Sequence, residues 1–176
     1  MQDGHDPMLV MEYMDYGSLY DLLHNETFDI EGEYILPIVQ DIAQGMRFLH
    51  AADPQIIHSD LKAQNILIDR RFRAKVTDFG LSQKKQLGAA GTPFWMAQEL
   101  LRGDTTNTAE SDVYSFGMVL FEIYSYQDPY EGENPDDVLM QVADPAVNKR
   151  PPIPPHAAKA IIVECFVGSQ PSPRIS

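Results

Sequence analysis

Four polar side chains lie close together in the middle of the sequence. Asp60, Lys62 and Asn65 fall in a loop between an apolar pair and a short β-type run, and Asp78 follows a second such run. Phosphoryl transfer needs a carboxylate to receive the proton of the attacking hydroxyl, oxygen ligands for magnesium, and a cation on the moving phosphate. This stretch supplies each of these groups, so its chemistry suits phosphoryl transfer.

Each of the four side chains has a role that its chemistry allows. Asp60 is the candidate general base, and Lys62 is the candidate cation on the transferred phosphate. Magnesium is a hard ion that takes oxygen ligands and keeps several waters, so Asn65 and Asp78 are suited to be a partial ligand set.

The same stretch resembles the signature motifs of the eukaryotic protein kinases. Residues 58–65, H-S-D-L-K-A-Q-N, are similar to the family's H-R-D-L-x-x-x-N motif except at Ser59, and residues 78–80 match D-F-G. A lone D-F-G fits many turns that follow a strand, but two motifs in order at short separation are specific. His58 follows an apolar pair, and we interpret it as a packed structural residue.

The resemblance implies a fold and an extent for the domain. We expect a mainly α (α+β) fold like the large lobe of a protein kinase, a helical bundle with short β-hairpins around the catalytic loop. A chain of 176 residues has room for one core, and no glycine-rich loop or V-A-I-K lysine of the small lobe precedes Met8. Residues 1–176 are therefore expected to form a partial kinase domain. Residues 1–17 would be the end of the small-lobe strand and the hinge, and residues 18–176 the large lobe, truncated before its last helix.

The resemblance also places the nucleotide. Residues 8–14 are apolar and β-prone, residues 15–18 form a turn that offers an N-cap, and a short helix is expected at 19–24. In a kinase this pattern is the hinge, with Met11 as gatekeeper and the backbone of 12–14 facing the adenine of ATP. The implied nucleotide-binding residues are Met11, Glu12, Tyr13, Met14, Leu67, Thr77 and Asp78.

Two longer helices must support these loops. Residues 33–51 show apolar side chains at helical spacing, with Pro37 within the first turns. A second helix is expected to begin after an Asn107 cap, with Glu110 three residues on, and to be buried because it is apolar nearly all round. The expected core positions of the first helix are Leu36, Val39, Ile42, Ala43, Met46 and Leu49.

Two charged groups outside the loop are expected to support it. Asp112 lies at the head of the buried helix and needs hydrogen bonds; the resemblance implies that backbone amides near His58 and Ser59 donate them. Residues 91–99, G-T-P-F-W-M-A-Q-E, resemble the end of a kinase activation segment with A-Q-E in place of A-P-E. Glu99 is then the implied partner of Arg150.

The remaining chain is less informative. We expect a turn-rich loop at 128–132, a short helix at 136–143, a stiff linker at 151–155 and a last helix at 157–167. Residues 170–174 resemble the family's D-P-x-x-R motif.

Composition excludes several classes of function. The formal net charge is -13, so a basic surface for nucleic acid is not expected. Cys165 is the only cysteine, which rules out a disulfide within the chain and favours a reducing compartment. Residues 1–7 are acidic and lack the apolar core of a signal peptide, and no apolar run approaches the roughly 20 residues of a membrane span. We expect a cytoplasmic location, which includes the cytoplasmic part of a membrane-anchored protein.

Two functions stay open. The first is an ATP- and magnesium-dependent protein kinase acting on serine or threonine, because Lys62 and the segment 91–93 look like that branch; the hinge leans toward tyrosine kinases, which suggests the tyrosine-kinase-like serine/threonine group. The isolated chain is expected to be inactive without the small lobe, and flanking regulatory domains are expected.

The alternative is a regulatory kinase-homology module, such as those of receptor guanylyl cyclases. Ser59 and Gln98 favour it, but retention of all four chemical side chains argues against it.

Ser59 also bears on regulation. It replaces the arginine that receives a phosphate in kinases switched by activation-loop phosphorylation, and a neutral hydroxyl cannot form that charge-assisted pair. Between Ser82 and Thr92 there is no serine, threonine or tyrosine, and Thr92 looks like the substrate-facing threonine. We therefore expect activity without an activation-loop phosphate.

Overall fold

The computed structural model describes residues 10–27, 30, 32–78, 91–103 and 106–155. Five helices are described in it, namely α1 (Leu19–Leu23), α2 (Gly32–His50), α3 (Gln98–Leu101), α4 (Ala109–Ser125) and α5 (Pro135–Ala143). Strands β1 (Ile66–Ile68) and β2 (Ala74–Val76) pair antiparallel, and two 3₁₀ turns, η1 (Ala63–Asn65) and η3 (Pro93–Trp95), flank the candidate site. Several expectations lie outside the described residues: Phe79 and Gly80, the loop with Ser82, and the last helix with Cys165.

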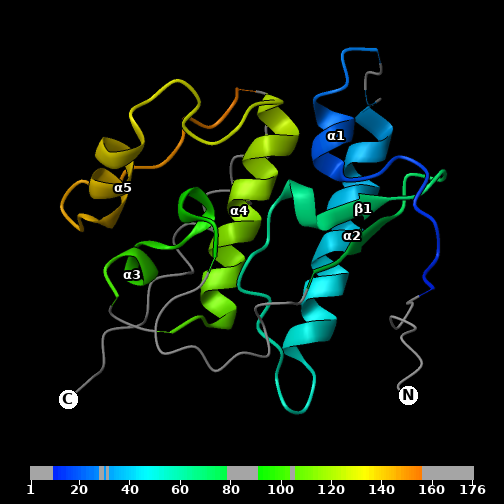
Figure 1. Ribbon diagram of the computed structural model, residues 1–176, viewed down its shortest axis with the longest axis horizontal. Coiled ribbons are helices and arrows are strands. Elements are labelled where there is room, and N and C mark those ends of the chain that lie inside the picture. The colour runs from blue at the N-terminus through cyan, green and yellow to red at the C-terminus, as the bar shows by residue number, and fades with distance from the viewer. Residues whose placement is uncertain (1–9, 28–29, 31, 79–90, 104–105, 156–176) are drawn as a thin grey trace, which may run out of the picture.

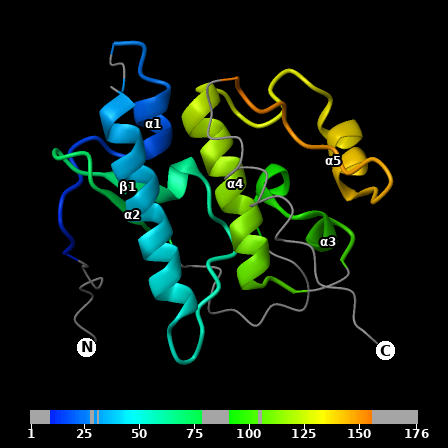
Figure 2. The same ribbon diagram turned by 180° about the vertical axis from the view of Figure 1, so that it is seen from behind.

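Helix α4 stands at the centre of the arrangement (Figure 1). Helix α2, helix α1 and the β1–β2 hairpin lie on one side of it, and α3 and α5 lie on the other, which the view from behind also shows (Figure 2). The hairpin packs on α2 through β2, and α1 packs against β1. The predicted helical bundle with a short hairpin is confirmed. The hairpin forms from the two short β-type runs that precede and follow the turn at 69–73, in the register Ile66 opposite Val76.

Helix α2 forms as predicted, but its buried face differs from the expected one. Ile38 is almost completely buried, whereas Leu36 is 57% exposed and Ala43 is also exposed. The buried stripe follows Ile38, Ile42, Met46 and Leu49, at the spacing of three to four residues that keeps side chains on one helix face. Leu36 lies two residues from Ile38, about 200° around the helix, so it points away from the core.

Helix α4 is buried as predicted, but its cap is not Asn107. Thr108 is the N-cap: its hydroxyl accepts from the Ser111 amide at 3.2 Å, and the Ser111 hydroxyl accepts from the Thr108 amide at 2.9 Å. This reciprocal pair satisfies two amides at the helix start, which is the function of a capping box. The expected pair of Asn107 and Glu110 was therefore wrong by one residue.

The N-terminal part of the expected hinge is not a strand. Residues 10–14 have no regular secondary structure, and Val10 and Tyr13 are 90% and 83% exposed. A strand is stabilised by hydrogen bonds to a neighbouring strand, and the one sheet described here is the β1–β2 pair. The turn and cap that follow are confirmed, because Ser18 and Asp21 form a capping box at the start of α1. Among the described residues no helix is long and apolar enough to cross a membrane.

Candidate active site

The loop of residues 58–65, called the catalytic loop below, holds Asp60 shortly before strand β1. The buried Asn65 ends η1, and its side-chain amide nitrogen donates to the backbone oxygen of Asp60 at 2.7 Å and to its carboxylate at 3.1 Å. These two bonds fix the orientation of the Asn65 side chain, and the second also holds the Asp60 carboxylate. With its nitrogen facing Asp60, the amide of Asn65 turns its oxygen away from Asp60.

Asp60, Lys62 and Thr92 form a closed group of hydrogen bonds. The Thr92 hydroxyl donates to one carboxylate oxygen of Asp60 at 2.6 Å, and Lys62 lies 3.2 Å from the other. Lys62 also donates to the Thr92 hydroxyl at 2.7 Å. The structure thus brings the candidate base and the candidate phosphate-binding cation together, and it adds Thr92, whose contact with the base was not foreseen. The segment G-T-P at 91–93 was the available signal.

Asp78 is carried to the same end of the hairpin as Asn65. The Thr77 amide donates to the backbone oxygen of Asn65 at 2.9 Å, so the residue after Thr77 leaves β2 next to the start of β1. Asp78 is exposed and has a positive φ of 63°. Within the described residues, no group of three His, Cys, Asp or Glu side chains is placed to hold a metal ion. A magnesium ion here would therefore need amide and phosphate oxygens as well as Asp78, which suits the way proteins bind this ion.

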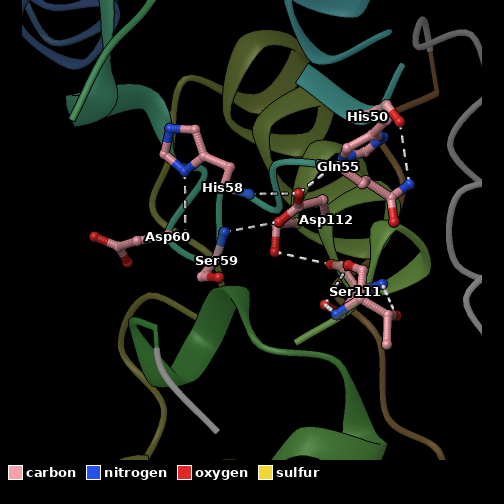
Figure 3. Close-up of polar contacts among 9 residues, drawn as sticks. His50, Gln55, His58, Ser59, Asp60, Ser111 and Asp112 are labelled. Carbon is pink, nitrogen blue, oxygen red and sulfur yellow. Dashed lines mark hydrogen bonds and ion pairs between the residues drawn. The ribbon is translucent and has the colours of Figure 1, made fainter. Parts of the chain in front are cut away.

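His58 has the structural role that the sequence indicated. Its side chain is fully buried, and Nε2 donates to the backbone oxygen of Thr77 at 2.9 Å. Nδ1 then accepts from the Asp60 amide at 3.3 Å (Figure 3). One neutral tautomer satisfies both bonds, so His58 connects the end of β2 to the catalytic loop without needing a charge.

Asp112, in the first turn of α4, supports the catalytic loop as predicted. Its carboxylate accepts from the His58 amide at 2.8 Å and from the Ser59 amide at 2.9 Å, and it is 1% exposed (Figure 3). A third donor was not foreseen: Nε2 of His50, at the end of α2, lies 2.8 Å from the same carboxylate. The head of α4 is thereby joined to both the catalytic loop and α2.

Glu122 is a second buried acid that the sequence analysis did not single out. One of its oxygens accepts from the indole nitrogen of Trp95 at 2.8 Å and from the Ala63 amide at 3.3 Å. Burial raises the pKa of this carboxyl to about 8. The signal was an acid on an otherwise apolar part of α4, and its effect is to join η1 to η3 beneath the site.

Comparison with known proteins identifies the family. A family model described as protein tyrosine and serine/threonine kinase matches residues 1–176. The chain belongs to the protein kinase family. The expected kinase-like fold, helices with a short β-hairpin, is confirmed with it.

The relatives of this kinase domain are named as serine/threonine enzymes. It is 39% identical over 170 residues to the probable serine/threonine-protein kinase drkC of Dictyostelium discoideum, which covers 90% of this chain and 22% of that protein. It is 43% identical over 142 residues to the serine/threonine-protein kinase CTR1 of Arabidopsis thaliana, which covers 76% of this chain and 17% of that protein. The chain thus spans about a fifth of the length of these relatives, and their names agree with the predicted serine/threonine branch.

The residues expected at the nucleotide come from the segment 11–14, from strand β1 and from the two residues after β2. Met14 is buried, whereas Met11 is 68% exposed and Glu12 forms an ion pair with Lys75 on β2. The segment is attached to β1, because the Tyr16 amide donates to the backbone oxygen of Ile68 at 3.1 Å. Leu67 on β1 and Thr77 after β2 belong to the hairpin that this segment contacts. The contacts of these residues with the nucleotide stay predictions.

Arg150 contacts the buried Tyr114, and the charge of Glu99 acts on the same residue. The Arg150 guanidinium lies over the Tyr114 ring at 4.8 Å from its centroid, and Glu99 is 5% exposed. Burial raises the pKa of the Tyr114 hydroxyl to about 12; Arg150 opposes that rise and Glu99 adds to it, so both charges act on the same ring. A direct pair between Glu99 and Arg150 remains a prediction.

The raised pKa of Glu122 predicts how stability depends on pH. The folded domain keeps this proton up to about pH 8, whereas an unfolded glutamate loses it near its usual pKa of 4.5. The folded state therefore binds more protons between these values, and stability falls as pH rises through this window. We expect the free energy of unfolding of the parent to fall by about 3 kcal/mol more than that of Glu122→Gln between pH 5 and pH 8.

Denaturant unfolding at a series of pH values measures this difference. Glutamine keeps an oxygen acceptor for Trp95 and cannot ionise, so the variant isolates the charge. Glu131→Gln is the matched control, because Glu131 is exposed and its replacement should leave the pH dependence of the parent. Parallel curves for the parent and Glu122→Gln would show that Glu122 is ionised in the folded domain.

Proposed function

We propose that this kinase domain, completed by its small lobe, transfers the γ-phosphate of ATP to serine and threonine hydroxyls of proteins. The observation that carries the proposal is the closed group of Asp60, Lys62 and Thr92. In this group a carboxylate and a cation of the catalytic loop and a hydroxyl of the segment 91–99 lie within hydrogen-bond distance of one another.

Each residue of the group would have a separate task. Asp60 accepts the proton of the attacking hydroxyl, as a general base does in phosphoryl transfer. Thr92 and Asn65 hold its carboxylate in one orientation, because each donates to a different oxygen. Lys62 supplies positive charge where negative charge develops on the transferred phosphate.

The donor set also fits magnesium. Asn65 and Asp78 would hold the ion, because both offer oxygen atoms and both leave the same end of the hairpin. When bound, magnesium would neutralise charge on the phosphates of ATP. The amide nitrogen of Asn65 is already engaged by Asp60, which leaves the amide oxygen for the metal.

The alternative, a regulatory kinase-homology module, rests on Ser59 and Gln98. Gln98 is the first residue of α3, a position where proline is well accommodated, and α3 forms with glutamine there. Ser59 contributes its backbone amide to the bond with Asp112, which any residue except proline can make. Neither of these two differences from the family motifs disturbs Asp60, Lys62 or Asn65, so the enzyme is favoured. The single cysteine supports a cytoplasmic location for it.

Phosphate transfer by the full-length protein tests the proposal. Labelled ATP, magnesium and an unstructured protein rich in serine and threonine are supplied, and ATP binding is measured in parallel by calorimetry. We expect transfer that stops when magnesium is chelated, and a loss of at least tenfold in Lys62→Ala with ATP binding kept. ATP binding without any transfer would instead support the regulatory module.

A further inference from the structure

We infer that Gly91 is a positioning residue, whose missing side chain lets the end of the activation segment rest on the catalytic loop and so sets the Thr92 hydroxyl against Asp60. The inference rests on the proposed kinase activity and deepens it. It concerns a backbone contact that the sequence motifs do not reveal.

The space beside Gly91 is filled by the catalytic loop. A Cβ atom added at Gly91 would lie 2.7 Å from the backbone oxygen of Ser59 and 3.2 Å from Cγ of Met96. The first distance is too short for any carbon–oxygen contact, and a backbone oxygen cannot rotate away as a side chain can. Gly91 also has a φ of +137°, a region that residues with a Cβ rarely adopt.

The backbone of Ser59 cannot move away from position 91, because a hydrogen bond to Asp112 holds it on the opposite side. Its amide donates to the Asp112 carboxylate at 2.9 Å, and the same carboxylate binds the His58 amide at 2.8 Å (Figure 3). Asp112 is almost fully buried at the head of α4. A larger residue at position 91 would therefore displace the activation segment and leave the catalytic loop in place.

Such a displacement acts directly on the base. Thr92 is the next residue, and its hydroxyl lies 2.6 Å from Asp60 and 2.7 Å from Lys62. Hydrogen bonds between oxygen atoms lie between about 2.5 and 3.0 Å, so a shift of a few tenths of an ångström weakens or breaks the bond to Asp60. Asp60 would then lose one of the donors that orient it.

The contact also suits the unusual residue at position 59. Gly91 meets the backbone oxygen of Ser59, so the arrangement does not depend on which side chain stands there. The contact holds the end of the activation segment against the catalytic loop, and it does so without a phosphate on the segment.

Gly91→Ala in the full-length protein tests the inference, with Gly103→Ala as the matched control. Gly103 also has a positive φ, +73°, but an added Cβ there would meet no atom within 4 Å. We expect Gly91→Ala to lower kcat by about 10- to 100-fold with the KM for ATP within about twofold of the parent. Gly103→Ala should keep the kcat of the parent.

A double substitution separates positioning from general damage. If Gly91 acts through the Thr92 hydroxyl, Gly91→Ala should lower kcat no further in a Thr92→Ala background. An equal fold loss in both backgrounds, or full kcat in Gly91→Ala, would overturn the inference.

Hydrogen exchange of the peptide covering residues 91–99 gives a readout that does not depend on activity. We expect faster exchange of this peptide in Gly91→Ala, because the added Cβ displaces the end of the activation segment from the backbone of Ser59, and parent-like exchange in Gly103→Ala. If the parent transferred no phosphate, the proposed function would fail, and the exchange result would still decide the contact. Unchanged exchange in Gly91→Ala would sink the inference.

Discussion

Asp60→Asn is expected to lower turnover by about two to four orders of magnitude. The substitution keeps the size of the side chain and an oxygen that can accept from Thr92, but it removes the group that receives the proton of the substrate hydroxyl. ATP affinity should change little, because the residues assigned to the nucleotide are on the hinge and the hairpin. Steady-state phosphate transfer and calorimetric ATP binding, both on the full-length protein, measure the two quantities.

Asp136→Asn is the matched control for that experiment. Asp136 lies in the first turn of α5 and is exposed, so the same chemical change there should leave turnover near the parent value. Parent-like turnover in Asp60→Asn would remove Asp60 from the role of base and would favour the regulatory module.

Asp112→Ala is expected to lower the free energy of unfolding by about 3–5 kcal/mol. The carboxylate satisfies the buried amides of His58 and Ser59 and also binds His50. Alanine leaves these donors without their acceptor and opens a space at the head of α4. Turnover should fall as well, because the catalytic loop loses its support; chemical denaturation and phosphate transfer measure both effects.

His50→Ala separates the parts of this network. It removes one of the three donors and leaves both amide bonds of the loop, so it should cost only about 1–2 kcal/mol and spare most of the turnover. If His50→Ala and Asp112→Ala were equally damaging, the backbone bonds from Asp112 to the catalytic loop would not be what stabilises the site.

Local patterns in the sequence predicted much of the framework. The hairpin, the helix α2 and the burial of α4 each follow from apolar periodicity or from short β-type runs. The need of a buried Asp112 for donors followed from the cost of burying an unpaired charge. The motif around Asp60 predicted which side chains would converge.

Features that depend on tertiary packing were missed or placed wrongly. Leu36 and Ala43 are apolar residues at helical spacing, but the position of the hairpin decides which face of α2 is covered. Thr108 and Asn107 are both good caps, and the neighbouring Ser111 decides between them. The roles of Glu122 and Gly91 come from contacts with residues about 30 positions away, which no local pattern contains.

Phosphoamino-acid analysis of the products tests the central claim most directly. The full-length protein is incubated with labelled ATP, magnesium and a protein mixture that offers serine, threonine and tyrosine, and the labelled amino acids are separated after hydrolysis. The arrangement of Lys62 and Thr92 around Asp60 predicts label in phosphoserine and phosphothreonine, and loss of that label in Asp60→Asn. Label confined to phosphotyrosine, or none in any of the three, would contradict the account.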